Sequence, residues 1–284
     1  MRKPKILIIP DFQGGAHDLR ATDTINHLSD KYEFTKKYWP DCKKPEQIDR
    51  DAYDLFFFIG YGLCLGQTPK NKTVCGITNS DFKAARERLP FVKAAHYPSE
   101  RMYQFIKGIT PLFYASHAKD VNIFKPFNVK NNRSFTVGMA VNGGNKQKGV
   151  KEVKEVVESI HGCQFISAMD KSIVYVNMPE FYNSIDVYVN FSQTEGCNNP
   201  IIESCCCGTP FISTDISPAR ELCEGGIIID RNKENLETAI KLLKKDKDLK
   251  EYLGTKAREK AVERYSWEVQ RGNYIKFLDW SINN

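Results

Sequence analysis

The feature that most constrains the fold is an alternation of short apolar runs with amphipathic segments, which occurs in both halves of this 284-residue chain. In the first half, runs rich in Ile, Val and Phe have the length of strands, and the segments between them have helical periodicity. The expected strands are 5–10, 55–59, 73–77 and 91–95, and the expected helices are 19–30, 81–88 and 99–107. This order predicts an α/β domain with a parallel sheet.

The second half repeats the alternation after a stretch, 120–133, that has turn residues and little periodicity. Its expected strands are 135–140, 164–167, 187–191, 210–213 and 227–229, and its expected helices are 150–160, 179–184 and 200–207. From Lys233 the pattern is helical, and 267–282 is an amphipathic segment expected to pack back across the first domain.

The chain is therefore expected to hold two Rossmann-like, doubly wound domains, 1–118 and 119–266, with 267–284 as a returning helix. With 41% hydrophobic residues it can form two cores. Open α/β sheets bind ligands at the carboxyl ends of their strands, so we expect the two domains to face a cleft.

The apolar runs and the cysteines favour a soluble, cytoplasmic protein. No run has the length of a membrane span, and the apolar run 6–9 is too short for a signal sequence. The nine cysteines, three of them consecutive at Cys205 to Cys207, have neither metal-site spacing nor the density of a disulfide framework. We therefore expect reduced, packed thiols and no metal site.

The positive charge is concentrated in the first half. The chain carries a net +6, and residues 1–118 hold 18 Lys and Arg against 13 Asp and Glu. Such a surplus is often only a solvated surface, but it also suits an anionic acceptor such as DNA or a phosphorylated lipid.

One segment, from Ser192 to Pro210, carries the most chemical information. It follows an expected strand, opens an expected helix and sets Glu195 and Glu203 eight positions apart. Gly196 and its neighbours put backbone N–H groups at a helix N-terminus, which favours a phosphate or the oxygens of a sugar. Glu195 can equally be a cap and Glu203 a first-turn residue favoured by the helix dipole, so the residues alone leave both interpretations open.

This segment resembles the Glu-x7-Glu signature of the retaining family-4 glycosyltransferases, whose two Rossmann-like domains form the GT-B fold. The resemblance extends over roughly residues 111–270 and includes several weaker motifs in register. These motifs are Lys148-Gly149, Met178 to Tyr182, Asp186 to Val189, Gly208 to Ile212 with Glu221, Gly225 and Gly226, and Ala257 to Trp267.

The resemblance implies a role for each matching residue. Glu203 would bind the ribose hydroxyls of the nucleotide. Glu195 and the backbone N–H groups that follow it would bind the sugar, and Lys148 would bind the diphosphate. The residues assigned to the nucleotide sugar are Gly14, Gly15, Gly143, Gly144, Lys146, Lys148, Val176, Glu195, Gly196, Cys197, Asn198, Asn199 and Glu203. Lys148 and Glu195 are the catalytic candidates, because a fixed ammonium stabilises a departing diphosphate without a metal.

The chain departs from the family pattern before Lys148. The family has an Arg about five residues earlier, where this chain has Gly143 and Gly144. Lys146 can supply a point charge there but not a bidentate fork, and the glycines can instead present backbone N–H groups to phosphates.

Acceptor-side candidates lie in or near the loops after the first-half strands. They are Asp11, His17, Asn79, Asp81 and His96. Residues of these types in such places are more often caps or turn residues than catalysts.

The resemblance predicts transfer of a hexose from a UDP- or GDP-linked donor to a hydroxyl, with retention of configuration and without metal or other cofactor. The sequence leaves the acceptor open, with hydroxymethylated DNA and a cell-surface or lipid-linked glycan as candidates. The alternative function is a catalytically weak module that binds nucleotide sugars, suggested by the missing Arg and the short first domain.

Overall fold

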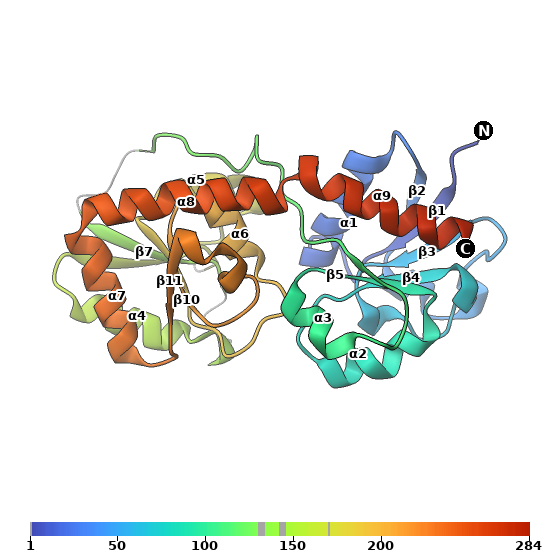
Figure 1. Ribbon diagram of the computed structural model, residues 1–284, viewed down its shortest axis with the longest axis horizontal. Helices are drawn as coiled ribbons and strands as arrows, with labels where there is room; N and C mark the ends of the chain where they lie inside the picture. The colour runs from blue at the N-terminus through green and yellow to red at the C-terminus, as the bar shows by residue number, and fades with distance from the viewer. Residues whose placement is uncertain (1, 130–133, 142–145, 170) are drawn as a thin grey trace. The chain divides into compact units, whose positions relative to one another are not determined.

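The computed structural model describes residues 2–129, 134–141, 146–169 and 171–284. The chain divides into two compact units, one formed by the residues up to His117 together with Trp267–Asn284, and the other by Ala118–Ser266 (Figure 1). Each has its own sheet and core. We describe the two units separately.

In the described part of the first unit, six parallel strands form a sheet in the order β2-β1-β3-β4-β5-β6. The strands are β1 (Lys5–Ile9), β2 (Glu33–Lys36), β3 (Leu55–Phe58), β4 (Thr73–Gly76), β5 (Ala94–Tyr97) and β6 (Leu112–Tyr114). All four residues of β3 are fully buried and apolar. A strand covered on both faces needs such a continuous apolar run, which is why the centre of this sheet was visible in the sequence.

Helices cover both faces of the first sheet. On one face lie α1 (Ala16–Leu28) and α9 (Trp267–Asn283), where His27 stacks on Trp267 at 4.4 Å between ring centroids and Phe277 packs edge-on against Phe57 at 5.8 Å. The other face packs against α2 (Phe82–Arg88) and α3 (Glu100–Ile106) through Ala85 and Met102.

In the described part of the second unit, five parallel strands form a sheet in the order β11-β10-β9-β7-β8. They are β7 (Phe135–Met139), β8 (Cys163–Ser167), β9 (Val187–Asn190), β10 (Phe211–Thr214) and β11 (Gly226–Ile229). The helices are α4 (Val150–Ser159), α5 (Met178–Asn183), α6 (Asn199–Cys206), α7 (Lys233–Lys245) and α8 (Lys247–Tyr265).

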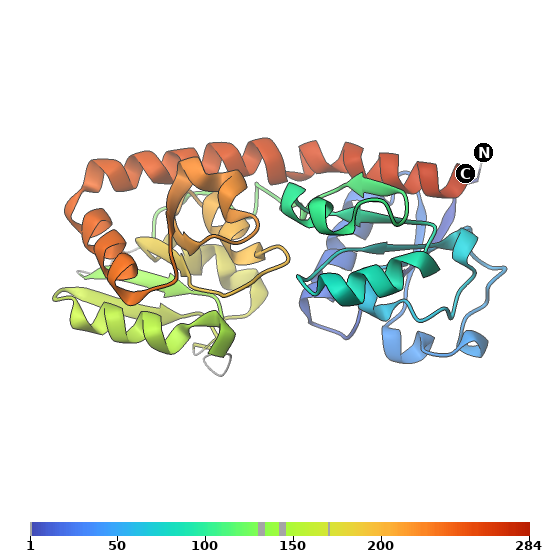
Figure 2. The ribbon, with the colours of Figure 1, turned by 60° about the horizontal axis from the view of Figure 1, so that its bottom comes forward.

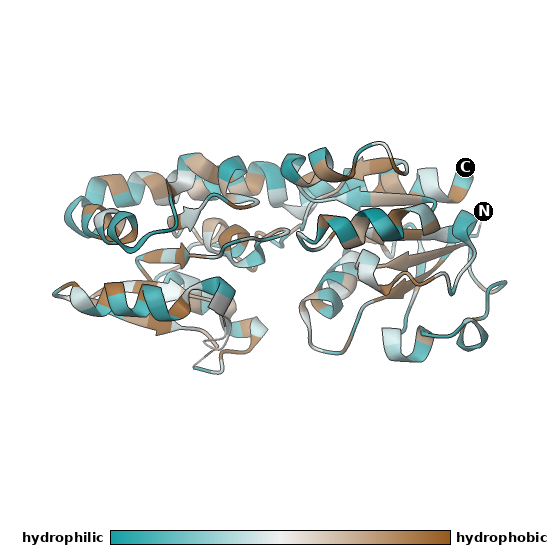
Figure 3. Cartoon of the chain, turned by 90° about the horizontal axis from the view of Figure 1, so that it is seen from below, coloured by the Kyte–Doolittle hydropathy of each residue, from teal (hydrophilic) through white to brown (hydrophobic). Residues whose placement is uncertain are grey.

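Alternating side chains of β9 separate two cores. Val187 and Val189 pack towards α4 and α7, and Tyr188 packs towards α5, α6 and α8. Figure 2 shows α4 and α8 on opposite sides of this sheet, and Figure 3 shows helices striped between hydrophilic and hydrophobic residues. Each helix therefore buries one stripe against the strands.

Short 3-10 turns join several of these elements. They are η1 (Trp39–Cys42), η2 (Pro45–Gln47), η3 (Tyr61–Leu63), η4 (Lys70–Lys72), η5 (Leu89–Phe91), η6 (Lys146–Lys148), η7 (Tyr175–Asn177) and η8 (Ala219–Gly225). Among the described residues, no helix is long and apolar enough to cross a membrane.

The second unit begins and ends at one place. Lys119 and Ser266 form a parallel bridge, and the N–H of Lys119 donates to the carbonyl of Tyr265 at 2.7 Å. The backbone therefore enters and leaves this unit along neighbouring paths.

Two expected elements differ from the observed ones. The strand expected at 91–95 begins only at Ala94, because Leu89–Phe91 around Pro90 forms a 3-10 turn. The helix expected from residue 19 begins at Ala16, directly after Gly15. Strands β2 and β6 were not predicted, since both are short and neither is fully buried.

Candidate functional site

The carboxyl ends of β7 and β9 mark the switch point of the second sheet. From β7 the chain moves outward to β8, and from β9 it moves the other way to β10 and β11. Loops after neighbouring strands diverge at such a point and leave room for a ligand. The loop after β7 ends in Lys148, and the loop after β9 carries Glu195.

Lys148 and Glu195 meet there as an ion pair. The Lys148 ammonium donates to Oε1 of Glu195, and the two side chains are 25% and 13% exposed. Gly149, which follows Lys148, is the N-cap residue of α4 and has a left-handed φ of +68°, which sets the direction of the backbone between Lys148 and the helix. A Cβ at this position would lie 2.7 Å from Cδ1 of Phe191, so both the conformation and the space require glycine.

Asn198 holds Glu195 and helix α6 in register. Its side-chain oxygen caps α6 by accepting from the N–H of Ile201 at 3.1 Å, and its Nδ2 donates to Oε1 of Glu195 at 3.1 Å. The Ser192 hydroxyl lies 2.8 Å from the same Oε1 and 2.8 Å from Oδ1 of Asn190. The carboxylate of Glu195 is thus fixed by an ammonium, an amide and a hydroxyl.

These residues line a cavity of about 320 Å³ at the start of α6. Five predicted site residues belong to its wall, namely Lys148, Glu195, Cys197, Asn198 and Asn199. Met169, half exposed, also lines it and was missed, because a single methionine after a strand carries no sequence signal.

The backbone of this segment modifies one expectation. The sequence assigned the N–H groups of residues 196–198 to the sugar, but the N–H of Asn198 donates to the carbonyl of Ser217 at 3.1 Å. The N–H of Asn198 is therefore used within the protein.

Glu203 does not line this cavity. It is 4% exposed, in α6, and its Oε1 accepts from the Lys119 ammonium at 2.7 Å while its Oε2 accepts from the Tyr182 hydroxyl at 2.7 Å. Burial, and then the negative charge of Glu203, raise the pKa of Tyr182 well above its usual range, so this hydroxyl stays protonated. Sequence reasoning missed Lys119, which lies 84 positions before Glu203.

In the first unit, the turn after β1 brings four candidates together. Gly14 has a φ of +78°, and its N–H donates to Asp18 at 2.9 Å. Asp11 lies beside His17, with Oδ2 and Nδ1 3.2 Å apart, and Gly15 is the N-cap residue of α1. Burial and the nearby Arg20 lower the pKa of His17 to about 4, despite the opposing effect of Asp11.

The other acceptor-side candidates have structural surroundings. Asn79 accepts from the Tyr61 hydroxyl, and Asp81 caps α2 by accepting from the N–H of Ala84 at 3.0 Å. His96 is fully buried, and its Nδ1 donates to the carbonyl of Ala115 at 2.8 Å. Complete burial argues against contact between His96 and an acceptor.

Four candidates for the nucleotide-sugar site remain. Gly143 and Gly144 lie outside the described residues, as does the side chain of Lys146. Val176 lies in η7 and is 77% exposed.

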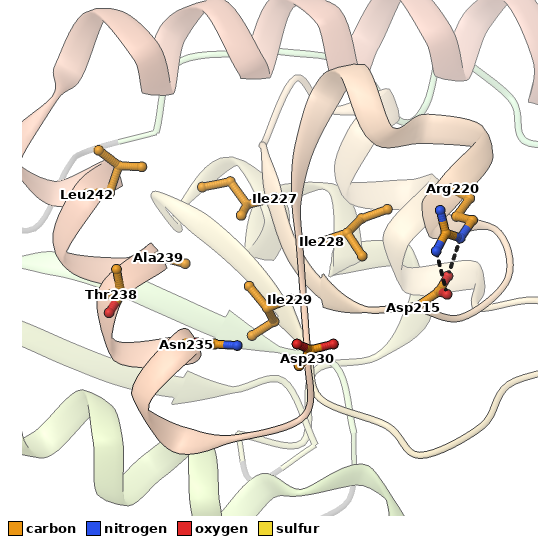
Figure 4. Close-up of a pocket in the computed structure, with 10 residues that line it drawn as sticks. All are labelled: Asp215, Arg220, Ile227, Ile228, Ile229, Asp230, Asn235, Thr238, Ala239 and Leu242. Atoms are coloured by element: carbon orange, nitrogen blue, oxygen red, sulfur yellow. Dashed lines mark hydrogen bonds and ion pairs between the residues drawn. The ribbon is translucent and has the colours of Figure 1, made fainter.

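A second cavity in this unit is larger but holds no predicted site residue. It measures about 410 Å³ and lies along β11 and α7 (Figure 4). Its Arg220 guanidinium already donates to both oxygens of Asp215, at 2.7 and 2.8 Å, on an exposed surface. Size alone therefore does not mark the chemical site. No group of three or more His, Cys, Asp and Glu within the described ranges is placed to hold a metal ion.

A family model matches the part of the chain that carries this candidate site. Residues 130–260, most of the second unit, match the model of the family described as glycosyl transferases group 1. No curated protein matches the sequence.

Solved structures of similar fold cover nearly the whole chain. Sucrose-phosphate synthase from Thermosynechococcus elongatus has a TM-score of 0.79 at 13% identity, covering 98% of this chain and 100% of that one. Anabaena HepE in complex with UDP and glucose has a TM-score of 0.79 at 13% identity, covering 97% and 99%. A glycosyltransferase from Rickettsia africae ESF-5 has a TM-score of 0.74 at 12% identity, covering 100% of both chains. The predicted fold class is confirmed: the chain has the two-domain α/β fold of GT-B glycosyltransferases.

Proposed function

We propose that this protein is a glycosyltransferase that moves a hexose from a UDP- or GDP-linked donor to an acceptor hydroxyl, with retention of configuration and without a metal. The observation that carries the proposal is the cluster of Lys148, Glu195 and Asn198 around a cavity of about 320 Å³ at the start of α6. This cluster lies inside the segment that matches the group 1 family.

The residues of the cluster suit the charges of the reaction. The bond between the sugar C1 and the β-phosphate oxygen breaks, and its electron pair goes to the phosphate. The acceptor oxygen bonds to C1 from the same face, and its proton passes to the departing phosphate oxygen. Lys148 and the N–H groups before α6 stabilise the charge that develops on the diphosphate, and Glu195 accepts from sugar hydroxyls.

Two further observations support the choice of donor. HepE, which shares this fold, forms a complex with UDP and glucose. The Lys148 side chain is 25% exposed, so its ammonium can exchange Glu195 for a phosphate. A UDP-linked hexose is therefore the first donor to test.

For the acceptor, we propose an anionic molecule that the first unit binds, such as hydroxymethylated DNA. The excess of Lys and Arg over Asp and Glu in residues 1–118 supports an anionic partner. Asp11 and His17 would orient its hydroxyl, beside the 61% exposed ring of Phe12. A neutral glycan is the competing acceptor.

The test is sugar release and transfer with a panel of UDP- and GDP-hexoses, with hydroxymethylated DNA and glycans as acceptors. The Lys148→Met variant is expected to lower kcat by about 10²- to 10³-fold, because it removes one charge that stabilises the transition state. Lys151→Met is the matched control, since Lys151 lies three residues on and is 87% exposed. It is expected to retain full activity.

Three outcomes would count against parts of this proposal. Nucleotide binding with a turnover that Lys148→Met leaves unchanged would favour the module that only binds nucleotide sugars. Absence of binding and of sugar release with every donor would overturn the function itself. Transfer to a neutral glycan but not to DNA would overturn the acceptor.

A further inference from the structure

The buried carboxylate of Glu203 is contacted by the side chains of three residues, Lys119, Tyr175 and Tyr182. It lies in α6 with its side chain 5% exposed, and the Lys119 ammonium, 7% exposed, is 2.7 Å from Oε1. Removing a carboxylate from water is costly unless a cation compensates for the lost hydration. The Lys119 ammonium supplies that cation for Glu203.

Lys119 is itself fixed from several sides. Its ammonium lies 5.9 Å from the ring centroid of Phe124 and 5.8 Å from that of Tyr175. Its backbone N–H donates to the carbonyl of Tyr265 at 2.7 Å. These contacts restrict the rotamers of Lys119, so its ammonium can hold the Glu203 carboxylate in one orientation.

The Glu203 carboxylate has the capacity to accept hydrogen bonds from two further hydroxyls. An ionised carboxylate accepts about four hydrogen bonds. Of the donors that the described residues supply, Lys119 and Tyr182 are at 2.7 Å, and the Tyr175 hydroxyl is at 3.4 Å from Oε1. The contact from Tyr175 is long and therefore weak. Tyr175 is half-buried, whereas Lys119 and Tyr182 are buried, so it is the most exposed of the three donors to Glu203.

We propose that Lys119 is a positioning residue for the nucleotide: with Tyr182 it fixes the orientation of the Glu203 carboxylate, so that this carboxylate accepts the two ribose hydroxyls when the Tyr175 hydroxyl moves away. The inference rests on the proposed function and assigns roles to Lys119, Tyr175 and Tyr182. A carboxylate free to rotate would lose the alignment of the two oxygens that a diol needs.

The experiment compares the Kd of UDP with that of 2′-deoxy-UDP, and of GDP with 2′-deoxy-GDP, by calorimetry. In the natural protein the ribonucleotide is expected to bind roughly ten-fold or more tightly, because the deoxy form leaves a charged acceptor unpaired. The Lys119→Met variant is expected to reduce this ratio to roughly three-fold or less, and Lys119→Arg is expected to restore it.

Two controls separate positioning from other effects. Lys148→Met is expected to weaken both nucleotides equally and to leave the ratio unchanged, since it acts on the phosphates. Lys250→Met removes a lysine that pairs with Asp186 in the same unit, with side chains 24% and 27% exposed, and is also expected to leave the ratio unchanged. Tyr175→Phe is expected to keep the ratio and to bind UDP at least as tightly, because a competing hydroxyl is gone.

Loss of one member of a buried pair can prevent folding, so a second variant keeps the test decisive. Lys119→Met/Glu203→Gln has no buried charge, and it is expected to fold and to bind the ribo and deoxy forms equally. A ten-fold preference that survives in either the single or the double variant would overturn the inference while leaving the proposed function intact. Absence of binding to every nucleotide by the natural protein would overturn both.

Discussion

At the scale of the residue, histidines in the first unit show how burial decides chemistry. His96 is fully buried and packs against Phe57, Tyr274 and Phe277. Burial lowers its pKa to about 3, although a hydrogen bond to the carbonyl of Ala115 opposes the shift, and nearby Arg20 lowers it further. The neutral ring therefore serves the core of this unit.

This shift predicts how stability depends on pH. The folded pKa of His96 lies below its ordinary value of about 6.5, so the unfolded chain binds a proton that the folded state does not. Stability is complete above about pH 6.5 and falls as the pH is lowered towards the folded pKa. Between pH 7 and pH 5, the free energy of unfolding measured with urea is expected to fall by roughly 2 kcal/mol less in His96→Gln than in the natural protein. Parallel pH profiles for the variant and the natural protein would contradict this.

At the scale of the element, the turn before α4 depends on one glycine. Gly149 combines a φ of +68° with a Cβ position 3.0 Å from the carbonyl oxygen of Phe191. This turn follows Lys148 directly, so the geometry of the candidate site depends on it.

Gly149→Ala is expected to destabilise the protein by at least about 2 kcal/mol, because it adds left-handed strain to a steric clash. Gly272→Ala is the matched control, since Gly272 lies within α9 and no other atom is within 4 Å of its Cβ position. That variant is expected to gain about 0.5–1 kcal/mol from the lower entropy of the unfolded chain. Urea unfolding measures both, and equal changes would contradict the argument.

The sequence predicted elements where local pattern and burial coincide. The apolar run at Leu55–Phe58 is a strand. The alternation of β9 places Tyr188 on one face of the sheet and Val187 and Val189 on the other. Strand β2, Glu33–Lys36, was missed because a short edge strand with two charged residues resembles a loop.

For the candidate site, the sequence motifs predicted Lys148 and Glu195, which form an ion pair in the structure, but they did not predict the environment of Glu203. The motif relates Glu203 to a glutamate eight positions earlier, whereas its contacts with Lys119 and Tyr182 come from the packing of α6 against α5 and the segment after His117. No local pattern records which distant lysine neutralises a buried carboxylate.

At the scale of the whole molecule, each unit has a core of its own, and α9 belongs to the first. Phe277 of this helix is fully buried and contacts the rings of Phe57, His96 and Phe113. The first sheet therefore depends on residues from the far end of the chain.

Phe277→Ala is expected to lower the free energy of unfolding of the first unit by about 3–5 kcal/mol, because it leaves a cavity among aromatic rings. Val269→Ala, on the same helix and 45% exposed, is expected to change stability by less than about 0.5 kcal/mol. Calorimetry should show a lowered transition for the first unit only, and a uniform shift of both units would argue against separate cores.

The bridge between Lys119 and Ser266 bears on the evolution and engineering of this chain. Because the backbone of the second unit starts and finishes at adjoining points, the first unit accommodates it as a single insertion, and the loop between His117 and Trp267 is already closed. The same adjacency makes Ala118–Ser266 a suitable segment for circular permutation by joining its ends, or for exchange with the corresponding unit of another protein of this fold.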